Sequence, residues 1–207
     1  PKVIMFTTAY FPFIGGAEVA IQEVSRRLAG EFRFFVITAR MRRDLPKRET
    51  RPEGTVIRVG FGGGLDKWFL PFLGAVAFFR ERRRLGGAVL LWGMDISAGA
   101  LCAAVVNMCS ARAPFVLTIQ YGYGGTRLRE GRWGAIGMAF RWMLKRASAV
   151  TVISSYLAEE AKHFGYRRPV ELLPNGVARE VFARMEPREG NSPPIVVHVG
   201  RLVQKNG

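Results

Sequence analysis

The stretch VIMFTTAYFPFIGGAEVAIQEVSRRL, residues 3–28, decides the class of fold. It opens with an apolar run of strand length at 3–7, passes through a loop with two glycines, and ends in a helical pattern at 17–28. That pattern places one apolar stripe on a single helix face, made of Ala17, Ile21, Val24 and Leu28. A strand, a loop and an amphipathic helix in this order form the basic unit of an α/β domain.

The same alternation continues along the chain. Further strands are expected at 34–38, 56–59, 89–92, 115–119, 150–153 and 170–173, and further helices at 68–84, 96–111, 132–146 and 155–164. Most of the strand runs are apolar throughout, which is typical of strands buried on both faces of a parallel sheet. The sequence therefore predicts an α/β fold with a Rossmann-like, doubly wound parallel sheet.

A domain boundary is predicted near the C-terminal end. LPNG at 173–176 is a turn signal, and residues 183–194 have the charged, Gly- and Pro-containing composition of a linker. The run IVVHV at 195–199 then resembles the first strand of another α/β unit. We expect an N-terminal domain over 1–183, a linker over 184–194, and the first strand and loop of a truncated domain over 195–207.

The composition limits the classes of partner. The chain has 207 residues, of which 49% are apolar, and a formal net charge of +15. The apolar fraction argues against disorder. The positive charge attracts anions, whether nucleotide phosphates, anionic lipid, polyanionic glycans or nucleic acid. A merely solvated basic surface is the alternative.

The small number of cysteines and the lack of a recognisable signal peptide favour a cytoplasmic location. Cys102 and Cys109 fall in a helical stretch, where we expect both to be small core residues, and no metal-binding or disulfide spacing occurs. We find no signal peptide, and the longest apolar stretches are too short or too interrupted to span a bilayer. Peripheral attachment at the inner face of the membrane stays open.

The first candidate site is the glycine pair in YFPFIGGAE, residues 10–18. Gly15 and Gly16 stand where a strand leads into a helix, so backbone N–H groups there can approach an anion, which the helix N-terminus also attracts. Neither G-x-G-x-x-G nor a P-loop is present. An anion site and a plain helix-entry turn are both open.

The second candidate is TIQYGYGGT, residues 118–126, which follows a strand at its carboxyl end. Open α/β sheets bind ligands at that edge. Gln120 offers a donor and an acceptor, and Tyr121 and Tyr123 offer stacking surfaces and hydroxyls, as a sugar requires. A connecting loop without a ligand is the alternative.

The third candidate follows the strand expected at 195–199. Arg201 offers a planar fork and Lys205 a point charge, which together suit a diphosphate. No nucleophile elbow and no paired acid–base carboxylates stand out, so the catalytic residues are unknown and no metal site is predicted.

Four stretches, taken in order, resemble the retaining, nucleotide-sugar-dependent glycosyltransferases of group 1, or family four, which have the GT-B fold. These stretches are FPFIGGAE at 11–18, AVTVISS at 149–155, LPNGV at 173–177 with Phe182 after it, and VGRLV at 199–203. The resemblance implies two Rossmann-like domains with a cleft between them. The N-terminal domain would mainly bind the acceptor, and the other would bind the nucleotide sugar.

The activity that this resemblance implies is of the hexosyltransferase type. A sugar passes from a nucleotide-diphosphate donor to a hydroxyl of a glycan or lipid-linked acceptor, with retention and without a cofactor, in cell-envelope or glycan biosynthesis. The residues implied to bind the donor diphosphate are Gly15, Gly16, Arg201 and Lys205.

The sequence departs from the family pattern in three places. Gln120 stands where the family often has a histidine, and glutamine cannot take a proton. Lys205 lies one position before the family's usual lysine, where Asn206 stands. The family's paired glutamates, E-x(7)-E, would lie beyond Gly207, so we expect the 207-residue chain to be inactive by itself.

Two stretches, 67–84 and 127–146, mix aromatic and basic residues. Both could dock on an anionic membrane. We favour the alternative that they are core-packing helices with solvated basic ends. The second candidate function is that of a non-catalytic basic module that binds anionic membrane or polyanion. Another two-domain α/β enzyme, such as an epimerase, is also open. The sequence has no nucleic-acid-binding signature, so no specific nucleic-acid partner is expected.

Overall fold

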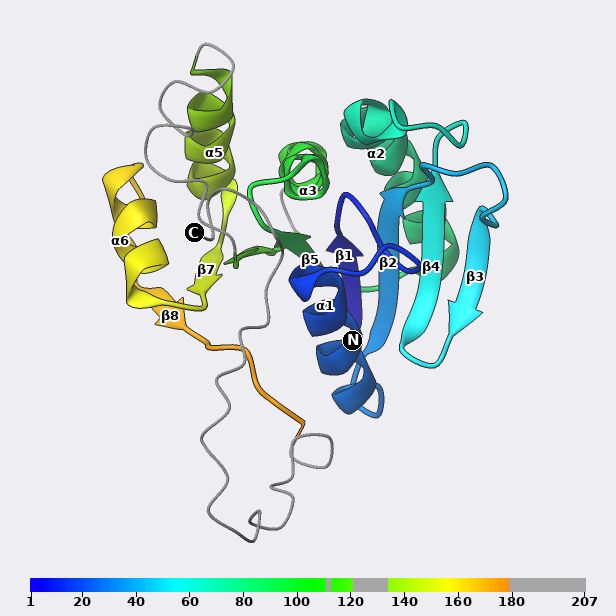
Figure 1. Cartoon of the computed structure of the whole chain (residues 1–207), viewed down its shortest axis with the longest axis horizontal. Coiled ribbons are helices and arrows are strands. Elements are labelled where there is room, and N and C mark those ends of the chain that lie inside the picture. The colour runs from blue at the N-terminus through cyan, green and yellow to red at the C-terminus, as the bar shows by residue number, and fades with distance from the viewer. Residues whose placement is uncertain (111–112, 121–133, 179–207) are drawn as a thin grey trace, which may run out of the picture. The chain divides into compact units, whose positions relative to one another are not determined.

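The computed structural model describes residues 1–110, 113–120 and 134–178 (Figure 1). The chain divides into two compact units, Pro1–Asn175 and Gly176–Gly207. The first contains every described helix and strand. In chain order these are β1 (Lys2–Phe6), α1 (Gly16–Arg27), β2 (Arg33–Ala39), β3 (Arg48–Arg51), β4 (Gly54–Val59), α2 (Asp66–Leu85), β5 (Val89–Met94), α3 (Ala98–Cys109), β6 (Phe115–Ile119), α5 (Ala135–Arg146), β7 (Ala149–Val152), α6 (Ser155–His163) and β8 (Val170–Leu172).

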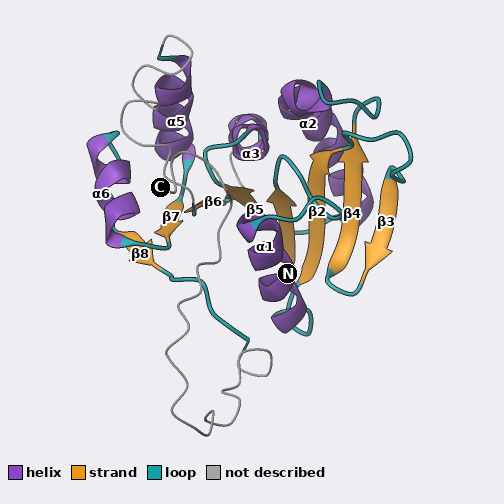
Figure 2. Cartoon of the chain, viewed as in Figure 1, coloured by secondary structure: helices purple, strands orange, loops and turns teal. Residues whose placement is uncertain are grey.

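The described strands form one eight-stranded sheet in the order β3-β4-β2-β1-β5-β6-β7-β8 (Figure 2). Every neighbouring pair is parallel except β3 and β4, which form an antiparallel hairpin at one edge. From β1 the chain runs outward in one direction through β2 and β4. It then returns to β5 and runs outward in the other direction. The predicted doubly wound sheet is confirmed, and its switch point lies between β1 and β5.

Helices cover both faces of the sheet because successive side chains of a strand point to opposite sides. In β1, Val3 and Met5 pack in the hydrophobic layer of α1. Ile4 and Phe6 of the same strand pack in the layer that receives α2, α3, α5 and α6. The central strands therefore lack a polar face, which explains their nearly continuous apolar runs.

Helix ends follow local capping chemistry. The helix expected from residue 96 begins at Ala98, because the Ser97 side chain accepts a hydrogen bond from the Ala100 N–H. The helix expected from residue 132 is described from Ala135, after Gly134 with a positive φ of 81°. Within the described ranges, no helix combines the length and the hydropathy that crossing a membrane requires.

One strand was missed in the sequence, and one expectation was wrong. The strand β3 was not predicted, because its sequence RETR is polar and only one neighbour pairs with it. Cys102 is buried as expected, but Cys109 is exposed, since it is the last residue of α3. The domain boundaries at 183 and 194 and the strand at 195–199 lie outside the described residues and stay predictions.

Candidate active site

The carboxyl ends of β1 and β5 lie next to each other, with Phe6 opposite Gly93 in register. This is the switch point of the sheet, where ligands bind in open α/β folds. The start of α3 presses against the end of β1 there. A Cβ added at Gly99 would lie 2.5 Å from the Thr7 Cα, so only glycine permits this approach. The Gly99 N–H also donates to the Thr8 hydroxyl at 3.3 Å.

The predicted glycine pair lies at this edge, at the start of α1. Gly15 is the N-cap residue and Gly16 is the first helical residue, and both are exposed. The Glu18 carboxylate folds back over Gly15, where a Cβ would lie 2.6 Å from the Glu18 Oε2. A Cβ at Gly16 would meet no atom within 4 Å, so the space beside Gly16 is open.

The Glu18 side chain forms the glutamate half of a capping box. Burial raises the pKa of Glu18 above its ordinary value, although hydrogen bonds with the backbone of Glu18 and Gly15 oppose the shift. A carboxylate therefore occupies the helix N-terminus at a place that favours an anion. The capping glutamate was missed in the sequence, although its position three residues after the N-cap glycine is a capping signal.

A buried network anchors the loop that joins β1 to α1. The Tyr10 hydroxyl donates to the Glu53 Oε1 at 2.9 Å, and the same oxygen accepts from the Arg51 Nε at 2.8 Å and from the Gln22 Nε2 at 3.2 Å. Burial of Tyr10 and the Glu53 charge raise the pKa of the Tyr10 phenol. Burial opposes ionisation of Glu53, but the hydrogen bond from Arg51 holds its pKa below the ordinary value.

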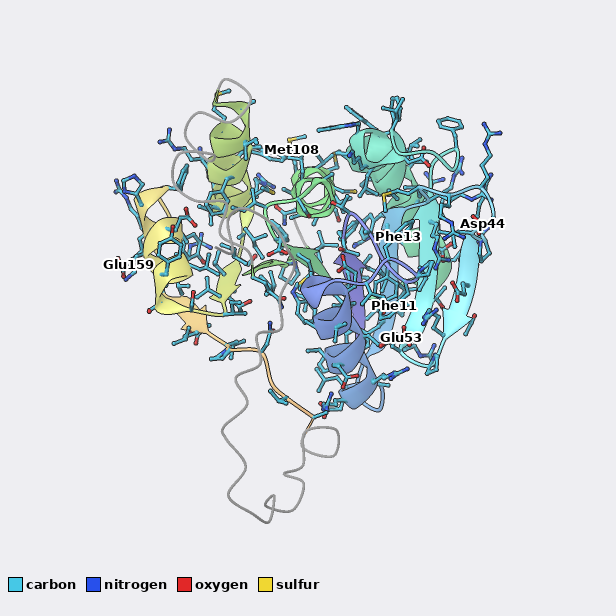
Figure 3. All side chains as sticks on the ribbon, in the orientation of Figure 1. Phe11, Phe13, Asp44, Glu53, Met108 and Glu159 are labelled. Carbon is cyan, nitrogen blue, oxygen red and sulfur yellow. The ribbon has the colours of Figure 1, made fainter. Side chains whose placement is uncertain are left out.

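A second contact set fixes the next residues of this loop. The Arg58 Nη2 donates to the Phe11 carbonyl at 2.8 Å and pairs with the Glu49 Oε2 at 2.7 Å. The Arg51 guanidinium lies 5.1 Å from the centre of the Phe11 ring. Figure 3 labels Phe11 and Glu53, both of which contact the Arg51 side chain. Side chains from the β3–β4 hairpin thus hold the loop that leads to Gly15.

Gln120 joins three segments at the carboxyl edge. Its N–H donates to the Asp95 Oδ1 at 2.6 Å, and its side-chain Nε2 donates to the Asn175 Oδ1 at 3.2 Å. Asp95 follows β5, Gln120 follows β6, and Asn175 follows β8. Asp95 has a positive φ of 59°, which is uncommon for a residue other than glycine and is typical of constrained sites. Amide and carboxylate groups gathered in this way can hydrogen-bond sugar hydroxyls.

Side-chain hydrogen bonds between three neighbouring strands lie next to this cluster. The Trp92 indole N–H donates to the Thr118 hydroxyl at 2.7 Å, and the Thr118 and Thr151 hydroxyl oxygens lie 2.6 Å apart. These three residues belong to the neighbouring strands β5, β6 and β7. These hydrogen bonds link β5 and β6, the strands whose carboxyl ends lead to Asp95 and Gln120.

The structure places three of the predicted site residues at one sheet edge, namely Gly15, Gly16 and Gln120. The others lie outside the described residues, so their roles stay predictions: Tyr121, Tyr123, Arg201 and Lys205. Asp95 and Asn175 were missed as site residues. The available signal for Asp95 was its place directly after a buried strand.

Among residues 1–110, 113–120 and 134–178, no group of three or more His, Cys, Asp or Glu side chains could hold a metal ion. A pocket of about 360 Å³, lined by Pro1, Lys2 and residues 29–33, lies at the amino ends of β1 and β2. That is the opposite sheet edge from Gln120, so this pocket is separate from the candidate site.

Similar solved structures show the same fold. Sucrose-phosphate synthase from Thermosynechococcus elongatus matches with a TM-score of 0.68 at 14% identity, covering 87% of this chain and 49% of that one. A structure titled trehalose-6-phosphate from E. coli bound with UDP-2-fluoro glucose matches with a TM-score of 0.59 at 11% identity, covering 88% of this chain and 50% of that one. The chain thus spans about half the length of both. The fold is that of the N-terminal part of a GT-B glycosyltransferase.

Sequence comparisons add the family. No curated protein matches the chain. A family profile described as Glycosyltransferase Family 4 matches residues 14–181, which is most of the chain. The match begins just before Gly15 and extends past Asn175, so it contains the polar cluster of the carboxyl edge. The chain belongs to glycosyltransferase family 4.

Proposed function

We propose that the protein containing this chain transfers a hexose from a nucleotide-diphosphate donor to a hydroxyl acceptor, with retention at the anomeric carbon. The observation that carries the proposal is the family match over residues 14–181. The similar structure whose title names UDP-2-fluoro glucose supports a nucleotide sugar as the donor. In the transfer, the bond from the anomeric carbon to the diphosphate oxygen breaks and its electron pair leaves with the diphosphate. A new bond to the acceptor oxygen forms on the same face of the sugar, and the acceptor proton passes to a phosphate oxygen or to solvent.

The proposal gives roles to residues of this chain. Gly15 and Gly16 approach the donor diphosphate through backbone N–H groups. The space at Gly16 is open, whereas the diphosphate must displace the Glu18 carboxylate from Gly15. Arg201 and Lys205 neutralise the charge that develops on the leaving diphosphate, without a metal. This charge stabilisation is the electrostatic part of the catalysis.

Gln120 is the first residue of the proposed sugar- or acceptor-binding site. Asp95 and Asn175 hold its backbone and side chain in place, and Tyr121 and Tyr123 follow it in the sequence. The glutamine amide binds a hydroxyl but cannot act as an acid or a base. No catalytic base is therefore assigned to this chain. We also propose that residues 1–207 alone do not turn over donor.

The proposed setting is cell-envelope or glycan biosynthesis in the cytoplasm, with an acceptor that is a glycan or is linked to a lipid. The net charge of +15 supports an anionic surface nearby. The second candidate function is a non-catalytic basic module that binds anionic membrane, which the exposed apolar residues of α2 favour.

Release of nucleoside diphosphate tests the proposal. The natural full-length protein is incubated with a panel of nucleotide sugars and with lipid-linked and soluble glycan acceptors. We expect one donor to give acceptor-dependent release. Gln120→Ala should reduce that release, whereas Tyr156→Ser, at an exposed site on α6, should not. Lipid binding without release from any donor would instead support the non-catalytic module.

A further inference from the structure

Helix α2 exposes apolar side chains along one face. The α2 stripe, as we call it, comprises Phe61 from the preceding loop and five residues between the N-cap and the middle of the helix: Leu65, Trp68, Phe69, Phe72 and Val76. Their spacing places them on one side of a helix. The opposite side packs on the sheet through Leu70 and Phe78, which are buried. The favoured expectation of a core-packing helix therefore holds for one face of α2 only.

Local structure holds the stripe outward. The Asp66 carboxylate is buried and accepts hydrogen bonds from the N–H groups of Phe61, Gly62 and Gly63 at 2.9, 2.7 and 3.1 Å. Burial opposes ionisation, but these bonds keep the pKa of Asp66 below its ordinary value. The Phe61 ring, 74% exposed, lies edge-on against Phe69 with 6.5 Å between ring centres. Hydrogen bonds to Asp66 thus fix the loop that carries Phe61, and the other residues of the stripe lie on a helix that packs on the sheet.

Positive charge accompanies the stripe. The Lys67 ammonium lies 5.6 Å from the centre of the Trp68 ring. Arg80 and Arg83 continue the exposed face one and two turns after Val76. The only acidic residues of α2 are Asp66 and Glu81, and both are buried. The exposed face of α2 is therefore apolar in its first half and basic in its last turns, with no exposed acid.

These two properties select one kind of partner. An anionic lipid surface buries apolar side chains and attracts Lys and Arg at the same time. A second copy of the chain, with its net charge of +15, would bring like charges together. The second aromatic and basic stretch exposes a single large apolar side chain in its described part, Met138, because Phe140 and Met143 are buried in the core.

We propose that the α2 stripe inserts among the headgroups of an anionic membrane. α2 follows β4 directly, so the stripe begins at the carboxyl edge of the sheet, the edge that carries Gly15 and Gln120 (Figure 1). Docking through the stripe brings this edge to the lipid surface. The docking itself does not depend on glycosyl transfer.

Cosedimentation of the 207-residue chain with vesicles tests the proposal. One set of vesicles is pure phosphatidylcholine and the other also contains phosphatidylglycerol. We expect binding to the anionic set, and loss of that binding at about 1 M salt, where the screening length is about 3 Å. Phe72→Ser should weaken binding about tenfold, because an exposed phenyl ring no longer enters the lipid. Phe69→Ser should act in the same direction.

Tyr156→Ser is the matched control, because Tyr156 is an exposed aromatic residue (60%) on α6, outside the stripe. It should bind vesicles like the unmodified chain. Circular dichroism should be unchanged for each variant, since all three side chains are exposed. Equal binding to neutral and anionic vesicles, or equal losses for Phe72→Ser and Tyr156→Ser, would overturn the proposal. So would a dimer that the stripe variants convert to a monomer. The assay uses no donor, so its result is independent of transferase activity.

Discussion

Replacing Glu53 with alanine removes an oxygen that three side chains share. The Glu53 side chain is fully buried, and its Oε1 accepts from Tyr10, Gln22 and Arg51. The Tyr10 hydroxyl would stay buried without an acceptor, which costs about 2 kcal/mol. The Arg51 side chain is 24% exposed, so solvent limits its loss to about 1 kcal/mol. We expect the free energy of unfolding to fall by about 3 kcal/mol.

Urea denaturation followed by tryptophan fluorescence measures this change. With a slope of about 2 kcal/mol per molar urea, the midpoint should fall by about 1.5 M. Glu23→Ala is the control, because Glu23 is a partly exposed residue of α1 whose ion pairs within the described part of the chain are with surface arginines. It should cost no more than about 0.5 kcal/mol. A shift for Glu53→Ala as small as that of Glu23→Ala would refute the argument. So would additive effects of Glu53→Ala and Tyr10→Phe, because residues in contact should couple.

Three further predictions concern stability. The pKa of Glu53 is lowered in the folded state, so ionised Glu53 adds to the free energy of unfolding above its unfolded pKa of about 4.3. This stabilisation is lost as the pH falls through the folded pKa. In an acid titration, Glu53→Gln should therefore lack this part of the fall in the free energy of unfolding. Gly99→Ala should lower the free energy of unfolding by about 2 kcal/mol, because its Cβ would lie 2.5 Å from the Thr7 Cα. Gly16→Ala should cause no steric loss, because a Cβ there meets no atom within 4 Å, and thermal unfolding compares the two variants. Glu18→Ala should lower the free energy of unfolding by about 1 kcal/mol, because it removes the glutamate half of a capping box. Urea denaturation measures this change, and an unchanged midpoint would show that the Glu18 carboxylate does not cap α1.

The fold was predictable from the sequence because its strands are buried on both faces. Runs such as 115–119 are apolar throughout, and the structure has β6 at Phe115–Ile119. The edge strand β3 lacks that signal, since half of its residues are exposed. The solvent face of α2 could not be predicted, because apolar residues occur all around this helix. Only packing shows that Leu70 faces the sheet while Phe69 does not.

The candidate site was predictable only in part. A glycine pair before a helix and a polar residue after a strand are local signals, and they gave Gly15, Gly16 and Gln120. The partners of these residues come from distant segments. Tyr10 and Glu53 are 43 positions apart, and Gln120 and Asn175 are 55 apart. Such contacts depend on strand order, which the local pattern does not specify.

The anomeric configuration of the product tests the central claim most directly. The natural full-length protein is given its nucleotide-sugar donor and acceptor, and proton NMR follows the anomeric signal of the transferred sugar as nucleoside diphosphate is released. The proposal predicts the same anomeric configuration in product and donor. An inverted product, or no transfer from any nucleotide sugar, would contradict it.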